Sequence, residues 1–363
     1  MTELPRVFLV IPRYCMESPV LGTAALCNAL VDVTDVSLVT LKPAASVGPF
    51  FSERVNRVDL SAYPGWYAKL RAYRAHLSEA AAKGRRPVSI SLAFSGDLFN
   101  LMSGSTAVRI ASLRNNPFMD YRFLFGRRGT IAAHLHVQAL KRFDCVFSMS
   151  KSMDQLLADS GVKRVRRVGN FIDEARFERP SAPAPLAGRQ IRLLCMGVLI
   201  ARKRWDRAIR CVHELRAAGH DVVLDMVGAG PLMEQLRSLA REKGLTDEIV
   251  RFHGFRNDRE VLLEQADVLL LPSESEGISR SVMEALYWGV PCVLRDVEAA
   301  GEIITDGVNG ALFSSETDIT AATLRAIAVR QASRAPNVSL LPDAFRQATC
   351  VAQVVDAIRQ LSR

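Results

Sequence analysis

The feature that most constrains the fold is an alternation, repeated along the whole chain, of short apolar runs with longer segments of helical period. Short apolar runs bounded by turn residues are typical of buried strands, and the segments between them have the spacing of amphipathic helices. Such alternation predicts parallel sheets covered by helices on both faces. The expected strands are 6–11, 36–41, 88–93, 108–113, 143–149, 165–168, 191–196, 221–227, 249–253, 267–271, 291–294 and 311–313.

One stretch interrupts this alternation. Residues 179–188 are rich in proline and small side chains and predict a linker. We therefore expect two tandem Rossmann-like, doubly wound α/β domains, 1–180 and 190–342, with a final helix in 343–363 that packs back on the N-terminal domain. Ligands of such sheets bind beyond the carboxyl ends of the strands, so the expected site is an interdomain cleft.

Other global features indicate a cytoplasmic protein. No apolar run approaches the roughly 18–20 residues that cross a bilayer. The N-terminus enters a strand-like run directly and lacks the pattern of a secretory signal. The seven cysteines are scattered and form no C-x-x-C pair, which indicates neither a zinc site nor a disulfide framework.

Charge is distributed unevenly between the two halves. Residues 1–180 hold 25 Lys and Arg against 15 Asp and Glu, a net +10, whereas the remainder carries a net −1. The basic half is expected to face an anionic partner such as a phosphorylated substrate, an acidic membrane surface or a nucleic acid. A solubilising surface without a partner is the alternative.

The segment 272–286 carries the clearest chemistry. A buried strand ends before Pro272 and a helix opens near Ser279, where free backbone N–H groups and the helix dipole favour an anion such as a diphosphate. Glu276 precedes that opening and Glu284 follows it inside the helix. Carboxylates accept hydrogen bonds from hydroxyl groups and repel phosphates, so this layout suits the sugar, diphosphate and ribose of a nucleotide sugar. By themselves, two glutamates at this spacing are also typical of a solvated helix.

Several other strand ends carry candidate ligand-binding groups. The cations 202–204 follow a strand and are placed to reach a diphosphate. Residues 228–231 lack a third glycine and predict a tight strand–helix turn rather than a dinucleotide fingerprint. Phe255 follows another strand and is a candidate wall for the base, and Gly22 is expected in the loop after the first strand, close to a ligand.

Taken in order, these motifs resemble glycosyltransferase family 4, whose members have the GT-B fold and are retaining and metal-independent. The match is dense over about 165–313 and thin before it. The motifs are Val168–Asp173, the Gly197–Lys203 spacing, Val227–Pro231, Phe252–Gly254, Pro272–Ala285, Gly289–Val293 and Asp306–Gly310.

The resemblance implies a role for each site residue. Glu276 and Lys203 would act in catalysis, by holding the donor sugar's hydroxyls and the diphosphate, and Glu284 would bind the ribose. The implied donor-binding set is Gly22, Arg202, Lys203, Phe255, Glu276, Gly277, Ile278, Ser279, Val282 and Glu284. The nucleotide sugar would be a co-substrate. No cofactor and no metal would be needed, and the sequence indeed contains no Asp-x-Asp pair.

The sequence also departs from the family pattern. Many members carry Arg where this chain has Val198, so Arg202 or Arg204 would have to substitute. The usual histidine of the first domain is not evident, and 113–117 resembles a variant of polysaccharide-building members, which places Arg114 and Asn115 beside the acceptor. The pair His134 and His136 does not share a helix face, and no acidic or cysteine partner is near in sequence, so we expect no metal there.

Segment 61–86 combines aromatic and basic residues. Trp66, Leu70, Tyr73 and Leu77 fall at helical spacing and predict a core-facing stripe, although the neighbouring cations would also suit anionic lipid headgroups. With the basic half, this fits a glycan or lipid-linked glycan acceptor of lipopolysaccharide or capsule type, handled at the inner face of the cytoplasmic membrane.

Three other functions remain as alternatives. A catalytically silent GT-B partner protein would have no need of Glu276, Glu284 and Lys203, all of which are present. A nucleotide-binding oxidoreductase would show a complete glycine fingerprint with an acidic residue downstream, which is missing. A nucleic-acid-binding protein would show a recognition motif, and none is found, so nucleic acid is not an expected partner.

Overall fold

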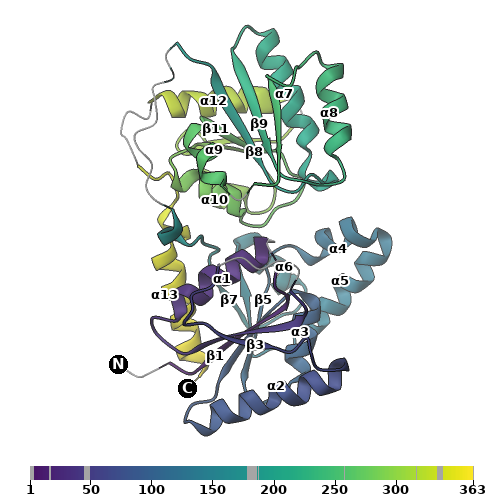
Figure 1. Ribbon diagram of the computed structural model, residues 1–363, viewed down its shortest axis with the longest axis vertical. Helices are drawn as coiled ribbons and strands as arrows, with labels where there is room; N and C mark the ends of the chain where they lie inside the picture. The colour runs from purple at the N-terminus through teal and green to yellow at the C-terminus, as the bar shows by residue number, and fades with distance from the viewer. Residues whose placement is uncertain are drawn as a thin grey trace. The chain divides into compact units, whose positions relative to one another are not determined.

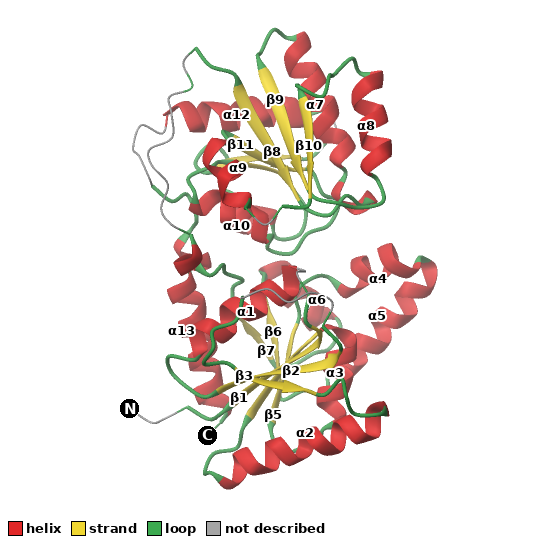
Figure 2. Ribbon diagram, in the orientation of Figure 1, coloured by secondary structure: helices red, strands yellow, loops and turns green. Residues whose placement is uncertain are grey.

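The computed structural model describes residues 4–15, 18–44, 50–177, 186, 188–256, 258–315, 317–332 and 338–362 (Figures 1 and 2). The chain forms two compact units. Unit 1 comprises Met1–Glu174 and Ala344–Arg363, and unit 2 comprises Ala175–Asp343. The expected linker, 179–188, falls mostly outside the described residues. In the described part, no helix combines the length and the apolar character that spanning a membrane requires.

Unit 1 contains a parallel sheet of seven strands in the order β3-β2-β1-β4-β5-β6-β7. The strands are β1 (Val7–Arg13), β2 (Val36–Lys42), β3 (Asn56–Asp59), β4 (Val88–Leu92), β5 (Val108–Ser112), β6 (Cys145–Ser148) and β7 (Val165–Arg167). The helices are α1 (Ser18–Leu30), α2 (Gly65–Ala82), α3 (Ala93–Met102), α4 (Pro117–Phe125), α5 (Arg127–Leu140), α6 (Lys151–Asp159) and α13 (Gln347–Leu361).

Side-chain alternation along β1 builds a core on each face of this sheet. Leu9 and Ile11 point to one face, where they join a cluster that includes Val354 of α13. Phe8 and Val10 point to the other face, where they pack with side chains of α2. Because successive strand residues face opposite sides, a strand buried on both faces reads as a continuous apolar run.

Helix α2 supplies part of the second core. Leu70, Tyr73 and Leu77 are fully or almost fully buried, which confirms three members of the predicted core-facing stripe. Trp66 is different, because it lies in the first turn and stays 43% exposed, with its ring against Phe99. The stripe therefore begins one turn later than the spacing predicts.

Unit 2 contains a parallel sheet of six strands in the order β10-β9-β8-β11-β12-β13. The strands are β8 (Ile191–Met196), β9 (Val222–Val227), β10 (Val250–Gly254), β11 (Val268–Leu271), β12 (Cys292–Arg295) and β13 (Gly310–Phe313). The helices are α7 (Trp205–Ala217), α8 (Met233–Glu242), α9 (Arg259–Gln265), α10 (Arg280–Tyr287), α11 (Ala300–Ile303) and α12 (Ile319–Ala332), and η2 (Ala201–Lys203) is a short 3-10 turn.

Both sheets grow outward from their first strand in one direction and then in the other. In unit 2 the order reverses between β8 and β11, and in unit 1 between β1 and β4. This is the topology of a doubly wound sheet, in which ligands bind at the switch point beyond the carboxyl ends of the strands. The prediction of two tandem Rossmann-like α/β domains is confirmed.

Candidate active site

The segment with the two glutamates leaves β11 at the switch point of unit 2. Strand β11 ends at Leu271 beside β8, and the chain forms a loop until Ser279, the N-cap residue of α10. Glu276 therefore lies in the loop and Glu284 on the helix, as the sequence predicts. The first N–H groups of α10 face the same end of the sheet, where they could bind an anion.

Glu276 is held between two cations from η2. Its Oε1 lies 2.6 Å from Lys203 Nζ and 3.2 Å from Arg202 Nη1, and only 14% of its side chain is exposed. Burial by itself raises the pKa of Glu276, but attraction to Lys203 and Arg202 outweighs it and holds the pKa below the ordinary value. The group is thus a carboxylate between an ammonium and a guanidinium.

Backbone and side-chain contacts fix η2 against the loop. Glu274 N donates to Arg202 O at 2.9 Å, and Arg204 Nη1 lies 2.6 Å from a carboxylate oxygen of Glu274. Arg207, on the first turn of α7, is buried and donates to Pro272 O at 3.2 Å. The contacts of Arg204 and Arg207 with the loop, together with the backbone bond from Glu274, therefore hold the segment that carries Arg202 and Lys203.

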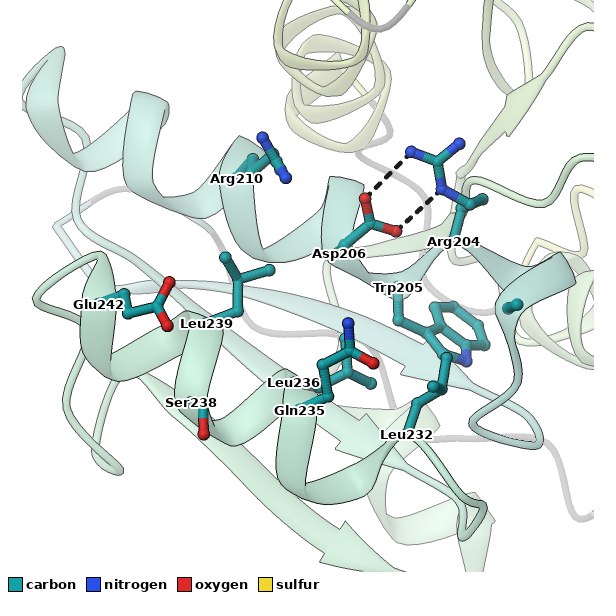
Figure 3. Close-up of a pocket in the computed structure, with 11 residues that line it drawn as sticks. Arg204, Trp205, Asp206, Arg210, Leu232, Gln235, Leu236, Ser238, Leu239 and Glu242 are labelled. Atoms are coloured by element: carbon teal, nitrogen blue, oxygen red, sulfur yellow. Dashed lines mark hydrogen bonds and ion pairs between the residues drawn. The ribbon is translucent and has the colours of Figure 1, made fainter.

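Arg202 and Arg204 are the two candidates to substitute for the arginine that family members carry at the position of Val198. Their side chains have different partners. Arg202 points to Glu276, whereas Arg204 pairs with Asp206 at 3.0 Å and with Glu274. Figure 3 shows Arg204 and Asp206 at the edge of a different pocket, of about 440 Å³, between α7 and α8. Neither Lys203 nor Glu276 lines that pocket, so Arg202 is the better placed of the two.

Glu284 is almost completely buried, with 1% of its side chain exposed. Arg280 Nη2 donates to its Oε1 at 2.9 Å, one helical turn away, and Arg259 Nη1 lies 3.5 Å from its Oε2. A buried carboxylate needs such partners, because an unpaired one would be too costly to desolvate. Arg259 was not anticipated from the sequence, since it lies on α9, 25 residues before Glu284.

Glu298 is a second residue that sequence reasoning missed. Its Oε2 accepts hydrogen bonds from Ser275 Oγ at 2.9 Å and from Glu276 N at 2.8 Å. The backbone of Glu298 has φ +46°, a left-handed conformation that residues other than Gly, Asn and Asp rarely adopt. A strained residue thus holds the backbone of the loop at Glu276. No short sequence pattern signals this contact, which joins β12 to the β11–α10 loop.

The remaining predicted donor residues are distributed as follows. Gly277 and Ser279 are partly exposed in the loop, and Ile278 is buried. The side chain of Val282 is fully buried in the core, which gives it a packing position. Phe255 follows β10 and is 61% exposed, so it is free to contact a ligand but touches none of the charged cluster in a recorded interaction.

The glycines at 228 and 230 allow two loops to touch. A Cβ at Gly228 would lie 1.8 Å from Gly197 O, and one at Gly230 would lie 2.4 Å from Leu199 O. The turn after β9 therefore packs directly on the loop after β8, which leads into η2. This supports the prediction of a tight strand–helix turn at 228–231, and it explains why both positions must be glycine.

In unit 1, the predicted site residues Gly22 and Arg114 lie beside Asn170. Arg114 Nη1 donates to Asn170 Oδ1 at 3.0 Å, and a Cβ on Gly22 would lie 3.3 Å from the same nitrogen. The structure thus brings Gly22 and Arg114 together, although the sequence assigned them to donor and acceptor. The placement of Gly22 in a loop is wrong, because it lies inside α1, whose early turn accommodates Pro19. Asn115 is partly buried and adjoins Arg114 in the same loop.

The two histidines have separate roles in α5. His136 is buried, with Nε2 2.7 Å from Asp97 Oδ2 and Nδ1 2.8 Å from the Tyr121 hydroxyl. His134 is exposed and contacts Thr130 O. No acidic residue is near this pair in the sequence, but the fold supplies one, because α3 brings Asp97 to His136 from 39 positions away. In the described part of the chain, no three His, Cys, Asp or Glu side chains gather as a metal site would require.

Comparisons with known proteins find sequence similarity to glycosyltransferases over part of this chain. Residues 190–328 match the family model described as "Glycosyl transferases group 1". Among curated proteins, the chain is 32% identical over 169 residues to the putative colanic acid biosynthesis glycosyltransferase WcaL of Salmonella typhimurium. It is 30% identical over 170 residues to the GDP-mannose-dependent alpha-(1-6)-phosphatidylinositol monomannoside mannosyltransferase of Mycolicibacterium smegmatis.

These matches cover 44% and 42% of this chain, and the chain spans 40% and 43% of the two relatives. The fold extends further than the sequence similarity. Anabaena Alr3699/HepE, solved in complex with UDP and glucose, aligns with 98% of this chain and 100% of its own at a TM-score of 0.76 and 15% identity. The family match thus lies within unit 2, and the solved structure shares the fold of almost the whole chain.

Proposed function

We propose that this chain is a retaining, metal-independent glycosyltransferase of family 4. It would move a sugar from a nucleotide-sugar donor to an acceptor hydroxyl of a lipid-linked, lipopolysaccharide or capsule glycan. The observation that carries the proposal is the buried cluster of Glu276, Lys203 and Arg202 at the switch point of unit 2. The whole cluster lies within the residues that match the family model.

The cluster suits the charge changes of sugar transfer. As the bond between the sugar and the diphosphate breaks, negative charge grows on the diphosphate, and Lys203 and Arg202 would stabilise it. Glu276 would accept hydrogen bonds from the sugar's hydroxyls while positive charge develops at the reacting carbon. Because these groups are already ordered and largely buried, little reorganisation is needed during the reaction.

The proposed step needs no separate catalytic base. The acceptor oxygen forms a bond to the reacting carbon on the face from which the diphosphate departs, so the configuration is retained. The bond from that carbon to the phosphate oxygen breaks, and the departing oxygen takes the acceptor's proton. Lys203 has three N–H donors, so it can contact Glu276 and a phosphate at the same time.

The donor would extend from Glu276 across the first turn of α10 to Glu284. Glu284 accepts from Arg280 through one oxygen and lies 3.5 Å from Arg259 through the other. A carboxylate oxygen accepts more than one hydrogen bond, so ribose hydroxyls could be added without breaking these pairs. Named neighbours use different nucleotides, GDP-mannose in one case and UDP in another.

The decisive experiment is a thermal-shift screen of nucleotide sugars, beginning with UDP-glucose and GDP-mannose, on the full chain. A donor present at about 100 times its dissociation constant should stabilise the protein by about 2.7 kcal/mol. The same titration with EDTA tests the metal-free assignment, which would be abandoned if chelation abolished binding. A donor that binds but is never turned over, with any acceptor glycan, would indicate a silent partner protein instead.

The acceptor is proposed from charge and resemblance together. Unit 1 carries 26 Lys and Arg against 15 Asp and Glu, a net +11, whereas unit 2 carries a net −2. A basic unit is expected to meet an anionic acceptor at the inner face of the cytoplasmic membrane. WcaL, which this chain resembles over part of its length, is named for colanic acid biosynthesis.

A further inference from the structure

The α4–α5 hairpin of unit 1 carries an unusual surface. Figure 1 shows the two helices side by side at one edge of this unit. Five large apolar side chains on the hairpin are exposed, with Leu124, Phe125 and Ile131 each more than 60% accessible. Single exposed apolar side chains are common, but a cluster on one element marks an interaction site. The cluster is Phe123, Leu124, Phe125, Ile131 and Leu135.

The backbone of the hairpin leaves these side chains no place in the core. Asn116 caps α4, and Gly126 makes the turn between the helices with φ +60°. A Cβ on Gly129 would lie 1.9 Å from Tyr121 O, so the two helices touch backbone to backbone. The rings of Phe118 and Tyr121 on α4 pack against His134 and His136 on α5, whereas the five apolar side chains of the cluster stay exposed.

A buried polar chain anchors the hairpin to the rest of unit 1. Tyr121 on α4 contacts His136 on α5, and His136 contacts Asp97 on α3. Asp97 in turn accepts from Ser91 Oγ at 2.7 Å. Burial raises the pKa of Tyr121, so the phenol stays neutral and can donate to His136. The helices that carry the exposed cluster are therefore held to unit 1 by buried hydrogen bonds.

The charges beside the cluster are positive and available. Arg122, Arg127 and Arg128 are exposed, and no recorded ion pair joins any of them to a carboxylate in the described part of the chain. Asp120 is the single acidic residue in the sequence from 117 to 140. Large apolar side chains flanked by arginines are typical of elements that lie in the interface of an anionic membrane.

Helix α2, the other candidate from sequence, uses its cations differently. On α2, Lys69 Nζ donates to Leu41 O and Arg74 donates to Ser103 O, and beyond the end of the helix Arg86 donates to Ala107 O. These cations thus bind backbone carbonyl groups within unit 1. Tyr67 is exposed on α2, but its neighbours Leu70 and Tyr73 are buried in the core. The α4–α5 hairpin is thus better suited to a lipid surface than α2.

We propose that the α4–α5 hairpin is the membrane-docking element of this protein. Phe123, Leu124, Phe125 and Ile131 enter the boundary between headgroups and acyl chains, while the three arginines bind anionic headgroups. The inference deepens the proposed function, because a lipid-linked acceptor would be presented at the surface on which the hairpin rests. The proposed membrane docking does not involve the donor site, so an experiment can refute the docking without refuting donor binding.

The test is co-sedimentation of the full chain with phosphatidylcholine vesicles, prepared with and without phosphatidylglycerol, at low and high salt. The wild type should bind the anionic vesicles and lose binding as salt is raised. Leu124→Ser with Phe125→Ser should reduce binding at least tenfold. Arg127→Gln with Arg128→Gln should reduce it about 25-fold, since each arginine near such a surface contributes about fivefold. Tyr67→Ser, an exposed apolar change on α2, is the matched control and should bind normally.

Three outcomes would overturn the inference. The first is negligible binding of the wild type to anionic vesicles, and the second is equal binding of the hairpin variants and the wild type. The third is an oligomer that the Leu124→Ser, Phe125→Ser variant disrupts on size exclusion, which would make the hairpin an interface between copies. Circular dichroism and the donor-induced thermal shift should be unchanged in every variant. If no donor shifts the wild type either, the proposed function fails separately.

Discussion

The two units carry different chemistry at the carboxyl ends of their sheets. In unit 2, both glutamates are matched by cations, Glu276 by Lys203 and Arg202, and Glu284 by Arg280 and Arg259. In unit 1, Arg114 Nη1 donates to the side-chain amide oxygen of Asn170 beside Gly22. The contacts described for the glutamates of unit 2 join opposite charges, whereas this contact of unit 1 joins a cation to a neutral amide.

This difference fits a division of labour. A ligand with phosphate and hydroxyl groups needs cations and carboxylates at fixed positions, and a set of buried pairs keeps them in place before the ligand arrives. The Arg114 guanidinium at the strand ends of unit 1 is a group that binds phosphates and carboxylates well. The predictions below test whether the paired charges of unit 2 act in the reaction and whether Arg114 of unit 1 acts in acceptor binding.

The largest effects are expected from the pair at the centre of unit 2. Glu276→Gln and Lys203→Ala should each lower turnover on the order of 10²–10³-fold, because each removes a contact that strengthens as the bond breaks. Steady-state kinetics on folded variants measures this effect. Arg210→Ala is the matched control, since Arg210 is an exposed cation of α7 that lines the other pocket, and it should cost far less. Wild-type turnover in both main variants would show that the site lies elsewhere.

The same pair predicts a pH effect with a defined sign. Lys203 and Arg202 hold the pKa of Glu276 below its ordinary value, so the wild-type rate should not fall at mildly acidic pH through this group. In Lys203→Ala the burial remains while one cation is lost, so the pKa of Glu276 should rise. The acidic limb of the pH–rate profile should then move to higher pH. An unchanged limb would mean that Glu276 does not need to be ionised.

Most of the strands were predictable because they are buried on one or both faces and leave an apolar run, although β7 has no buried residue. All twelve expected strands are present within about two residues, whereas β3 was missed because only Val58 of its four residues is buried. A short edge strand with three exposed residues resembles a loop. The helix that begins after Ser279 was predictable for a different reason, since strand end, turn and apolar periodicity succeed one another within a few residues.

The partners of the site residues were not predictable in the same way. Arg259, Glu298 and Asp97 contact their partners across 22 to 39 positions of sequence, through neighbouring strands or helices. Periodicity reports which face of an element is buried, but not which residue of another element meets it there. Gly22 was misplaced for a related reason, because a glycine near a strand end fits either a loop or the start of a helix.

A smaller effect is expected at the other end of the donor segment. Glu284→Gln should weaken donor affinity about tenfold or more, since a hydrogen bond to a charged group contributes about 1.5–3 kcal/mol, while turnover at saturating donor stays near wild type. The variant should also melt earlier, because Arg280 and Arg259 lose a buried partner. Arg280→Gln separates the two effects, since it weakens the pair but keeps the carboxylate. A large loss of turnover in Glu284→Gln would contradict a ribose role.

A substitution of Arg114 in unit 1 should change the KM for the acceptor and not the affinity for the donor. Arg114→Gln should raise the acceptor KM several-fold, on the scale of one hydrogen bond to a charged group, and leave donor affinity unchanged. Asn170→Ala, which removes the partner of Arg114, should raise the same KM by less, because the cation remains. Donor titration by thermal shift and acceptor kinetics measure the two constants. A change in donor affinity alone would move Arg114 to the donor side.

The smallest effect is expected at Glu298, where a substitution should change turnover but leave the melting temperature almost unchanged. Glu298→Gly should relieve the left-handed backbone at φ +46°, which costs of the order of 1 kcal/mol for a residue with a side chain, but it also removes the acceptor of Ser275 Oγ and Glu276 N. These two changes oppose each other in stability, so the melting temperature should stay close to that of the wild type. Turnover should nevertheless fall a few-fold, because the loop that carries Glu276 is no longer held from behind and small misplacements lower the rate. Glu298→Ala keeps the backbone strain and loses the same hydrogen bonds, so it should melt earlier than Glu298→Gly but show a similar rate. If the rate followed the melting temperature across the two variants, Glu298 would contribute to folding alone and would not position Glu276.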